Sequence, residues 1–319
     1  MNTPPCNACE LDVVHDTRYR YTSPVSLAHH QAHLQPLQDE HQALLSMALQ
    51  IDPAPGQRRD SLDALGNAQT HFSLSLAHRQ LQVRCHSRLC VWPRFAGLQA
   101  AASPAWDELA QGLRYVSCAA LQPAVEFAMP SPYVPRLREL RDYARPSFTP
   151  GRPVAQAALA LMQRLHHDFA FETRSTEVDT PLAQAFAQRR GVCQDFAHLM
   201  IGALRMLGLP ARYVSGYLLT QAPDGSAPLV GADASHAWVQ LWCPGTPGVP
   251  TQGASAGWLD LDPTNNLVPA CSHVRLAVGR DFADVTPLRG VIRGGGRHSL
   301  DVAVTTRLLA PSAAFARVC

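Results

Sequence analysis

The chain has 319 residues, of which 46% are hydrophobic and 16% charged, and its net charge is +2. This composition is sufficient for a sizeable core and excludes an intrinsically disordered chain, and the near-neutral charge gives no electrostatic sign of nucleic-acid binding. The length favours two domains, and no apolar run approaches the ~20 residues that a membrane-spanning helix needs. We therefore expect neither a nucleic-acid partner nor a membrane partner.

The N-terminal segment contains Cys6-x-x-Cys9 but neither the basic region nor the apolar region of a signal peptide. The nine cysteines are irregularly spaced, which is typical of reduced thiols rather than of a disulfide framework, so a cytoplasmic protein is expected. Cys6 and Cys9 could supply half of a zinc site, but no second pair clearly completes it, and we expect no metal there.

Residues 11–100 show the period-two alternation of antiparallel strands that have one wet face. The alternating tracts are 19–21, 72–76, 81–85 and, after a short break, 89–92. Downstream of them, Ser103 precedes Pro104, which is the pattern of a helix start with the serine as its cap.

Residues 130–153 contain six prolines and are the expected linker, with a domain boundary near Pro150. From Val154 to Phe169, apolar residues recur every three to four positions, which predicts a helix.

A second helix is expected from about Cys193 to Leu207, because its apolar residues form one stripe. Gly208 stands where a left-handed C-terminal cap is wanted, and Pro210 prevents continuation. Strands are expected after it at 212–219, 236–242, 258–261 and 300–304.

Three residue types in this order can form the site of a thiol enzyme. The cysteine at the start of this helix is a nucleophile, the histidine at the start of a strand is a base, and the acid after the next strand can orient that base. The helix N-terminus favours a thiolate at Cys193, for which His236 can act as the base. Asp262 could accept the Nδ1–H of His236 and fix its tautomer. The backbone N–H of Cys193 is then a natural oxyanion donor.

Each of these residues also has an ordinary structural interpretation. Cys193 could be a small core residue, His236 a buried histidine with its hydrogen bonds satisfied, and Asp262 the start of a turn. Asp260 competes with Asp262, because two residues on a strand separated by one position face the same side.

Two further polar residues lie in the cysteine helix. His198 follows Cys193 by five positions, roughly 140° round the helix, so it is a poor candidate for the base. Asp195 is expected to contact the N–H groups of the first turn.

Four segments in this order resemble the bacterial transglutaminase-like family. They are Gly-Val-Cys-Gln-Asp-Phe-Ala-His (191–198), Gly-Leu-Pro-Ala-Arg-Tyr-Val-Ser-Gly-Tyr (208–217), Ser-His-Ala-Trp-Val (235–239) and Trp-Leu-Asp-Leu-Asp-Pro-Thr-Asn (258–265). Tyr19-Arg20-Tyr21 and Leu65-Gly66-Asn67 are similar to the β-rich N-terminal domain that accompanies this core in bacteria, and 279–285 also resembles the family.

The resemblance implies an α+β fold of the papain-like Cys-His-Asp superfamily, in which a helix that carries the cysteine packs on an antiparallel sheet that carries the histidine and the acid. It makes Cys193 the nucleophile, His236 the base and Asp262 the orienting acid, since the family's acid precedes a Pro-Thr turn. The implied domains are an N-terminal β-rich domain with its linker (1–150), a catalytic core (151–272) and a C-terminal β extension (273–319).

The expected function is cysteine-dependent acyl transfer on an amide bond of a peptide or protein substrate, without a cofactor. Hydrolysis of a peptide or isopeptide bond is favoured, because water needs no second binding site, whereas amine transfer needs one that excludes water. Protein-glutamine amine transfer shares the first half-reaction and stays open. A non-enzymatic peptide-binding module and a metal-dependent enzyme also stay open, as does the oligomeric state.

Two other segments lead to weaker expectations. His29-His30-x-x-His33 has helical zinc-ligand spacing that Asp39 or Glu40 could complete, although a solvated surface segment is favoured. The loop at 218–231 is expected to border the cleft and to influence substrate choice.

Overall fold

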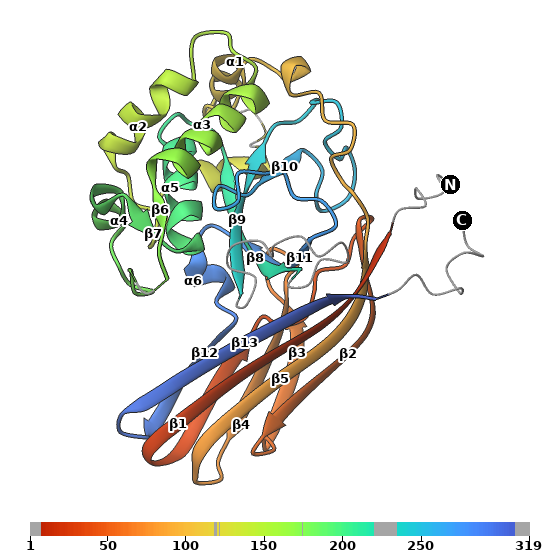
Figure 1. The fold of residues 1–319 in the computed structure, drawn as a ribbon, viewed down its shortest axis with the longest axis vertical. Helices are drawn as coiled ribbons and strands as arrows, with labels where there is room; N and C mark the ends of the chain where they lie inside the picture. Colours follow the sequence, from red (N-terminus) through yellow and green to blue (C-terminus); the bar gives the residue numbers. More distant parts are fainter. Residues whose placement is uncertain (1–7, 118–119, 121, 174, 220–234, 310–319) are drawn as a thin grey trace, which may run out of the picture.

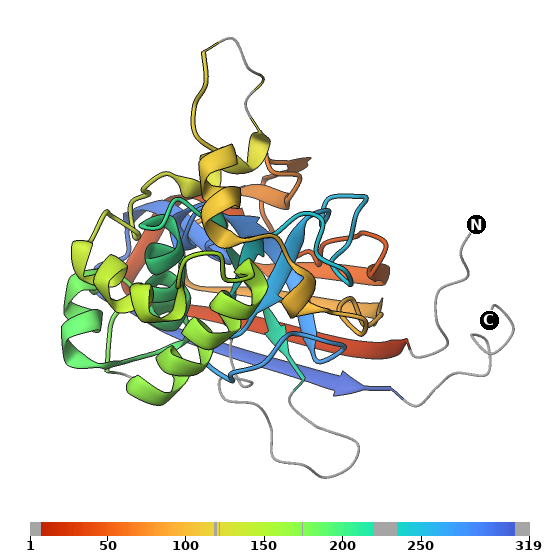
Figure 2. The same ribbon diagram turned by 90° about the horizontal axis from the view of Figure 1, so that it is seen from above.

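The computed structural model describes residues 8–117, 120, 122–173, 175–219 and 235–309, and its fold is α+β, as expected. Figure 1 shows an upper part, in which helices pack beside a small sheet, and a lower part made of long strands. The lower part combines both ends of the chain, because red N-terminal and blue C-terminal strands lie side by side in Figures 1 and 2. In the described ranges, no helix is long and apolar enough to cross a membrane.

The large sheet is antiparallel and is organised around its longest strand. Its strands are β1 (Cys9–Ala32), β2 (Gln42–Asp52), β3 (Gln57–Leu62), β4 (Ala68–Leu74), β5 (His78–Val91), β12 (Leu288–Gly294) and β13 (His298–Leu308). With 24 residues, β1 pairs with β5 and β13 along its first half and mainly with β4 and β12 along its second half. The alternating tracts fall mostly in these strands, but β5 runs without interruption through the break expected near residue 87.

The helical part contains six α-helices and three short 3₁₀ helices within the described residues. They are η1 (Ala100–Ala102), α1 (Trp106–Gly112), η2 (Pro123–Ala128), α2 (Arg138–Ala144), η3 (Arg145–Ser147), α3 (Val154–Asp168), α4 (Leu182–Gln188), α5 (Cys193–Arg205) and α6 (Phe282–Val285). α2 and η3 lie inside the proline-containing segment 130–153, and Leu140 and Phe148 are buried in the core. Pro146 stands in the first turn of η3, where a missing N–H is tolerated, so these prolines are compatible with packed helices.

The small sheet has the order β10-β9-β8-β11 and is antiparallel throughout. Its strands are β8 (Ala211–Leu218), β9 (His236–Trp242), β10 (Trp258–Leu261) and β11 (His273–Gly279). The stripe of α5, which includes Phe196, Leu199 and Met200, is buried against this sheet. Gly208 ends the helical segment with φ +81°, as the sequence predicts, and Leu209 N–H donates to the carbonyl of Leu204.

Two expectations differ from the structure in detail. Ser103 caps α3 rather than the helix that follows it in sequence: the bridge between Ala105 and Pro153 brings Ser103 to α3, where its Oγ accepts from Ala155 N–H at 3.0 Å. The segment expected as a C-terminal β extension, 273–319, contributes to both sheets, because β11 pairs with β8, whereas β12 and β13 pair with β1.

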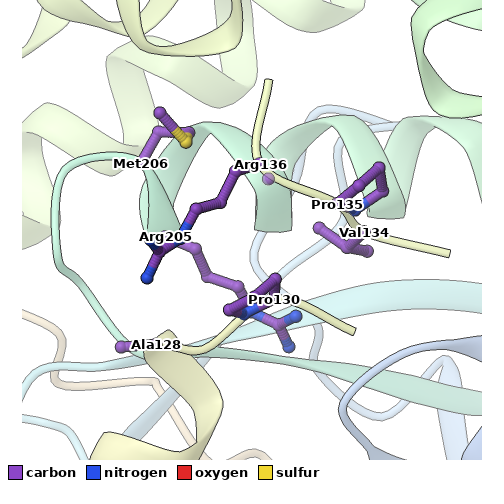
Figure 3. A pocket seen from close by; sticks show the side chains of 8 residues that line it. Ala128, Pro130, Val134, Pro135, Arg136, Arg205 and Met206 are labelled. Atoms are coloured by element: carbon purple, nitrogen blue, oxygen red, sulfur yellow. The ribbon is translucent and has the colours of Figure 1, made fainter. Parts of the chain in front are cut away.

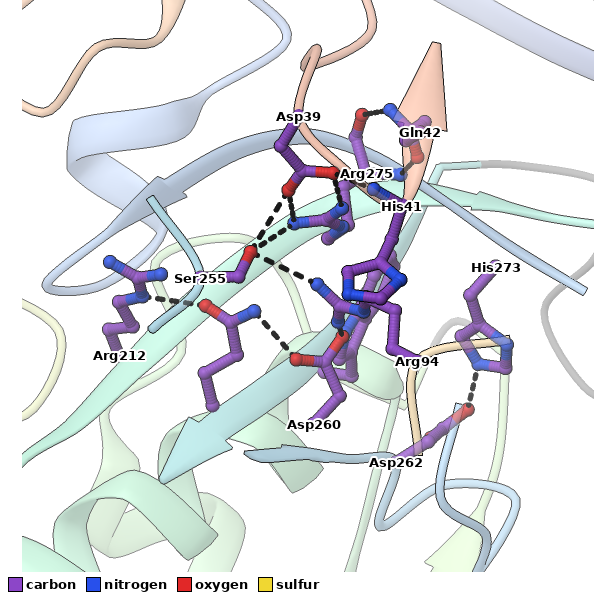
Figure 4. A network of polar contacts seen from close by, with 12 residues as sticks. Asp39, His41, Gln42, Arg94, Arg212, Ser255, Asp260, Asp262, His273 and Arg275 are labelled. Atoms are coloured by element: carbon purple, nitrogen blue, oxygen red, sulfur yellow. Dashed lines mark hydrogen bonds and ion pairs between the residues drawn. The ribbon is translucent and has the colours of Figure 1, made fainter. Parts of the chain in front are cut away.

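Buried ion pairs join the loops that follow β1 and β5 of the large sheet to the small sheet (Figure 4). Asp39 accepts from Arg275 of β11, with an Nη2–Oδ1 distance of 2.8 Å, and Arg94 pairs with Asp260 of β10. Ser255 bridges the two pairs through its hydroxyl. Burial lowers the pKa of Arg94 to about 10, so the guanidinium keeps its charge at neutral pH.

Candidate active site

The turn before α5 places Cys193 at the first position of the helix. Two short parallel strands, β6 (Ala170–Phe171) and β7 (Arg190–Gly191), hold this turn, and Val192 is extended before the helix begins. Cys193 is partly exposed there, and its backbone N–H belongs to the first turn, whose N–H groups have no partner within the helix. The location therefore combines partial exposure of the thiol with the N–H groups of a helix N-terminus.

Asp195 holds the same turn from inside the helix. Its Oδ2 accepts from Val192 N–H at 2.8 Å and from the Thr176 hydroxyl at 2.6 Å. A Cβ at Gly191 would lie 2.5 Å from that oxygen, so only glycine leaves room for the carboxylate. Asp195 therefore caps the start of the helix, through the N–H of the residue before Cys193.

His236 and Asp262 are brought together by the pairing of β9 with β10. His236 is the first residue of β9, and Asp262 follows the last residue of β10. Their side chains are completely buried, and the Nε2 of His236 lies 2.9 Å from Oδ2 of Asp262. The expectation that Asp262 holds Nδ1 is wrong: since Asp262 approaches from the Nε2 side, Nδ1 is the ring atom that remains to face Cys193.

The charges of the three side chains reinforce one another. Burial pulls the pKa of His236 down, but Asp262 and then the Cys193 thiol outweigh it and raise this pKa to about 10. Burial acts to raise the pKa of Asp262, yet the two histidines that contact it hold that pKa well below its usual range. The structure thus favours an imidazolium at His236 between two groups that can be anionic. Nδ1 of His236 makes no hydrogen bond of normal geometry to the described residues.

A second histidine, His273, contacts the same carboxylate and was missed by sequence reasoning. Its Nε2 lies 3.1 Å from Oδ2 of Asp262, and its Nδ1 lies 2.9 Å from the Ser272 hydroxyl. Burial first, and then the charge of His236, lower the pKa of His273. No local pattern marks His273, because it belongs to β11, which reaches the site only through its pairing with β8.

Asp262 is held by its own turn as well. It accepts from Thr264 N–H at 3.0 Å and from the Asn265 side-chain amide at 2.8 Å. These donors and the histidines satisfy the carboxylate in a place where water has no access.

Asp260 faces the same side as Asp262, as predicted, but it serves different partners. It accepts from the indole of Trp238 at 3.1 Å and from the amide of Gln240 at 2.6 Å, in addition to Arg94. His236, Trp238 and Gln240 are every second residue of β9, so their side chains lie on one face of the strand. The two acids that contact them therefore lie along that same face. Asp260 thus belongs to the buried ion network of Figure 4, whereas Asp262 is the acid that contacts His236.

The other sequence candidates lie elsewhere. His198 is buried between Tyr133 and Tyr213 and accepts from Phe282 N–H at 3.2 Å. Burial lowers the pKa of His198 to about 3, so it stays neutral.

The histidines at 29, 30 and 33 do not have helical spacing in space, because His29 and His30 are neighbours on β1 and point to opposite faces of the sheet. His30 and His33 are buried, so the favoured expectation of a solvated segment is wrong for them. Asp39 is engaged by Arg275 instead. Cys6 and residues 220–231 of the predicted cleft loop lie outside the described residues.

One group in the described part of the chain has the composition of a metal site. Ligand atoms of His236, Asp262 and His273 lie within 4.8 Å of one another, and imidazole and carboxylate ligands suit zinc. The same atoms already hydrogen-bond to one another, so the geometry is explained without an ion.

A cavity of about 270 Å³ lies beside the other end of α5 (Figure 3). Val134, Pro135, Arg205 and Met206 are among its lining residues. Arg205 is 12 residues from Cys193 along the helix, a rise of about 18 Å. This cavity is therefore not the site that contains Cys193.

The chain is similar to known proteins over both of its parts. The family model described as the bacterial transglutaminase-like N-terminal region matches residues 11–89, and the model of the transglutaminase-like superfamily matches residues 141–263. An uncharacterized protein of Mycobacterium tuberculosis is 36% identical over 92% of this chain and 90% of its own length. A protein-glutamine gamma-glutamyltransferase of Pseudomonas aeruginosa is 36% identical over 42% of this chain and 19% of its own length.

A solved structure supports the fold at lower sequence identity. A candidate cysteine protease from Cytophaga hutchinsonii aligns with a TM-score of 0.70 over 96% of this chain and 92% of its own, at 22% identity. The alignment spans the large sheet as well as the helical part, so the whole arrangement recurs in that protein.

Proposed function

Because the chain belongs to the transglutaminase-like superfamily and carries the bacterial N-terminal region of that family, we propose that it is a cysteine-dependent enzyme that cleaves peptide or isopeptide bonds through a thioester. One observation carries the proposal: His236 lies between a buried carboxylate, Asp262, and the thiol of Cys193, which begins a helix. These are the roles of orienting acid, base and nucleophile.

The proposed reaction begins with attack of the Cys193 thiolate on the carbonyl carbon of the substrate amide. The backbone N–H of Cys193 donates to the oxyanion that forms. His236 then gives its proton to the leaving amine, the C–N bond breaks and a thioester remains. A water molecule, deprotonated by His236, attacks the thioester and releases the acid together with the thiol.

The choice of acceptor separates hydrolysis from amine transfer. Water needs no second site, which favours hydrolysis. Amine transfer is the second candidate, because the Pseudomonas aeruginosa relative is a protein-glutamine gamma-glutamyltransferase. That relative matches 139 residues of the chain, so the similarity supports the shared thioester step more than the acceptor.

The first test is the pH dependence of iodoacetamide labelling at Cys193, read by peptide mass spectrometry. Labelling well below the free-thiol pKa of about 8.5 is expected in the wild type and should slow in His236→Ala. The buried thiols Cys85 and Cys243 are internal controls for unfolding. If the labelling rate of Cys193 is the same in the wild type and in His236→Ala, the result would instead support a binding module on an enzyme fold.

The second test gives the protein glutamine-containing peptides with and without a fluorescent primary amine. Hydrolysis predicts, in both reactions, either a cleaved peptide or a peptide in which glutamate replaces glutamine with release of ammonia, and no incorporated amine. Amine transfer predicts a labelled peptide. Cys193→Ser should abolish either product, and activity that survives this substitution would rule out the thioester.

A further inference from the structure

Two cysteines outside the candidate site lie against each other across the boundary between the two parts of the molecule. Cys9 begins β1 in the large sheet, and Cys271 precedes β11 of the small sheet. The side chain of Cys9 hydrogen-bonds to that of Cys271, and the backbone of Cys9 also hydrogen-bonds to the Cys271 side chain. The pair therefore joins residues 262 positions apart in sequence (271 − 9).

The surrounding packing places the same two segments together independently. Cys9 packs against an apolar cluster that includes Val91 of β5 and Val274 of β11. A cavity of about 10 Å³ has both Val91 and Ala270 in its wall, and Val91 is the residue paired with Cys9. The loop before β11 is thus fixed beside the first residue of β1.

Among the described cysteines, Cys90 lies in the strand paired with β1 but on the other face of the sheet from Cys9. Cys90 pairs with Glu10, whereas Cys9 pairs with Val91. Since paired residues share a face and neighbours alternate, Cys90 and Cys9 lie on opposite faces of the sheet. Cys90 is also buried, while Cys9 and Cys271 are both partly exposed and accessible to a small reagent.

We propose that Cys9 and Cys271 form a redox-active dithiol, whose disulfide would clamp β1 of the large sheet to the loop before β11. The reaction partner is a low-molecular-weight disulfide. The Cys9 thiolate attacks one of its sulfurs, the reagent's S–S bond breaks and one thiol leaves. Cys271 then attacks the mixed disulfide at the Cys9 sulfur and releases the second thiol. One disulfide is consumed, one is formed and two reagent thiols are produced.

The pair is chemically asymmetric in the way this sequence of steps needs. The hydrogen bond from Cys271 outweighs burial and lowers the pKa of Cys9 to about 7, while the same contact and burial raise the pKa of Cys271. Cys9 is therefore the attacking thiolate at neutral pH, and Cys271 is the thiol that resolves the mixed disulfide.

The test equilibrates the full chain with graded ratios of oxidised to reduced glutathione, followed by alkylation and non-reducing peptide mapping. We expect a Cys9–Cys271 linked peptide whose amount rises with the oxidised fraction. Cys90→Ser should keep it, and Cys9→Ser and Cys271→Ser should each lose it. The accessible thiol of Cys193 should stop at the mixed disulfide with glutathione, which serves as a control for reagent access.

A second readout is the melting temperature of the wild type in its oxidised and reduced forms. The disulfide closes a long loop in the unfolded chain, so the oxidised wild type should melt higher than the reduced protein by on the order of 5 °C. Cys271→Ser should show no such shift. Free alkylation of Cys9 and Cys271 at every glutathione ratio, or a disulfide from either residue to Cys6 instead, would overturn the proposal.

Discussion

At the scale of single residues, Asp262 contacts the Nε2 atom of His236, and this contact leaves Nδ1 free to face Cys193. Cys193, His236 and Asp262 can be selected from residue types, neighbouring turns and a family resemblance. The sequence does not predict that Asp262 contacts Nε2 rather than Nδ1 of His236, because this depends on the side from which Asp262 approaches the ring. His273 is invisible for a similar reason, since its contact with Asp262 exists only after β11 has joined the sheet.

The two neighbouring acids should respond differently to the same substitution. Asp262→Asn removes the charge that holds the imidazolium of His236, so turnover should fall by about 10³-fold or more while the fold is retained. Asp260→Asn acts on Arg94 and should lower stability more than turnover. Steady-state kinetics and urea unfolding of both variants separate these effects. A greater loss of turnover in Asp260→Asn would reverse the assignment.

The raised pKa of His236 also predicts how stability depends on pH. Its folded-state pKa of about 10 lies above the unfolded value of 6.5, so the imidazolium stabilises the fold fully below pH 6.5. That contribution should fade as the pH rises through about 10. Urea unfolding between pH 6 and 10.5 should therefore show a stability difference between wild type and His236→Gln that narrows with rising pH. A difference that stays constant would mean that His236 is neutral in the fold.

At the scale of elements, periodicity predicts much and pairing partners little. The ranges expected for β9 and β10 agree with the structure, and α3 and α5 begin where their apolar stripes begin. Ser103 caps α3 and not the helix that follows it in sequence, because a hydroxyl near one helix start in sequence can lie in space beside another. The proline-containing segment is expected to be a linker, but it forms α2 because Leu140 and Ala144 are buried in the core.

The turn before α5 offers a test of how one glycine positions the thiol. In Gly191→Ala the new methyl would collide with the Asp195 carboxylate, so the cap at Val192 should be lost at a cost of about 1–2 kcal/mol. Iodoacetamide labelling of Cys193 should slow together with this loss of stability. The matched control is Gly112→Ala, where nothing lies within 4 Å of the added Cβ, and it should leave both quantities nearly unchanged. Equal behaviour of the two variants would contradict the role given to Asp195.

At the scale of the whole molecule, the sequence does not predict that the C-terminal strands β12 and β13 pair with the N-terminal strand β1. β12 and β13 lie more than 250 residues from the β1 residues they pair with, and alternation alone names no partner. The network of Asp39, Arg94, Asp260 and Arg275 is hidden in the same way, since each residue is unremarkable within its own segment. Buried ion pairs of this kind attach the large sheet to the small sheet of the helical part.

This attachment can be tested by removing one charge from the network. In Asp39→Asn the guanidinium of Arg275 stays buried without its anion, and such a loss costs about 3 kcal/mol or more, although Ser255 keeps one hydrogen bond to Arg275. The matched control is Asp301→Asn, which breaks the ion pair between β13 and Arg20, where both side chains are more than 60% exposed. Exposed pairs contribute little, so the control should change the free energy of unfolding by less than about 1 kcal/mol.

Urea unfolding followed by tryptophan fluorescence measures both variants. Because Asp39 lies outside the candidate site, its loss should lower stability while the labelling rate of Cys193 in the folded protein stays unchanged. Equal stability of the two variants would mean that the buried network does not hold the two parts together.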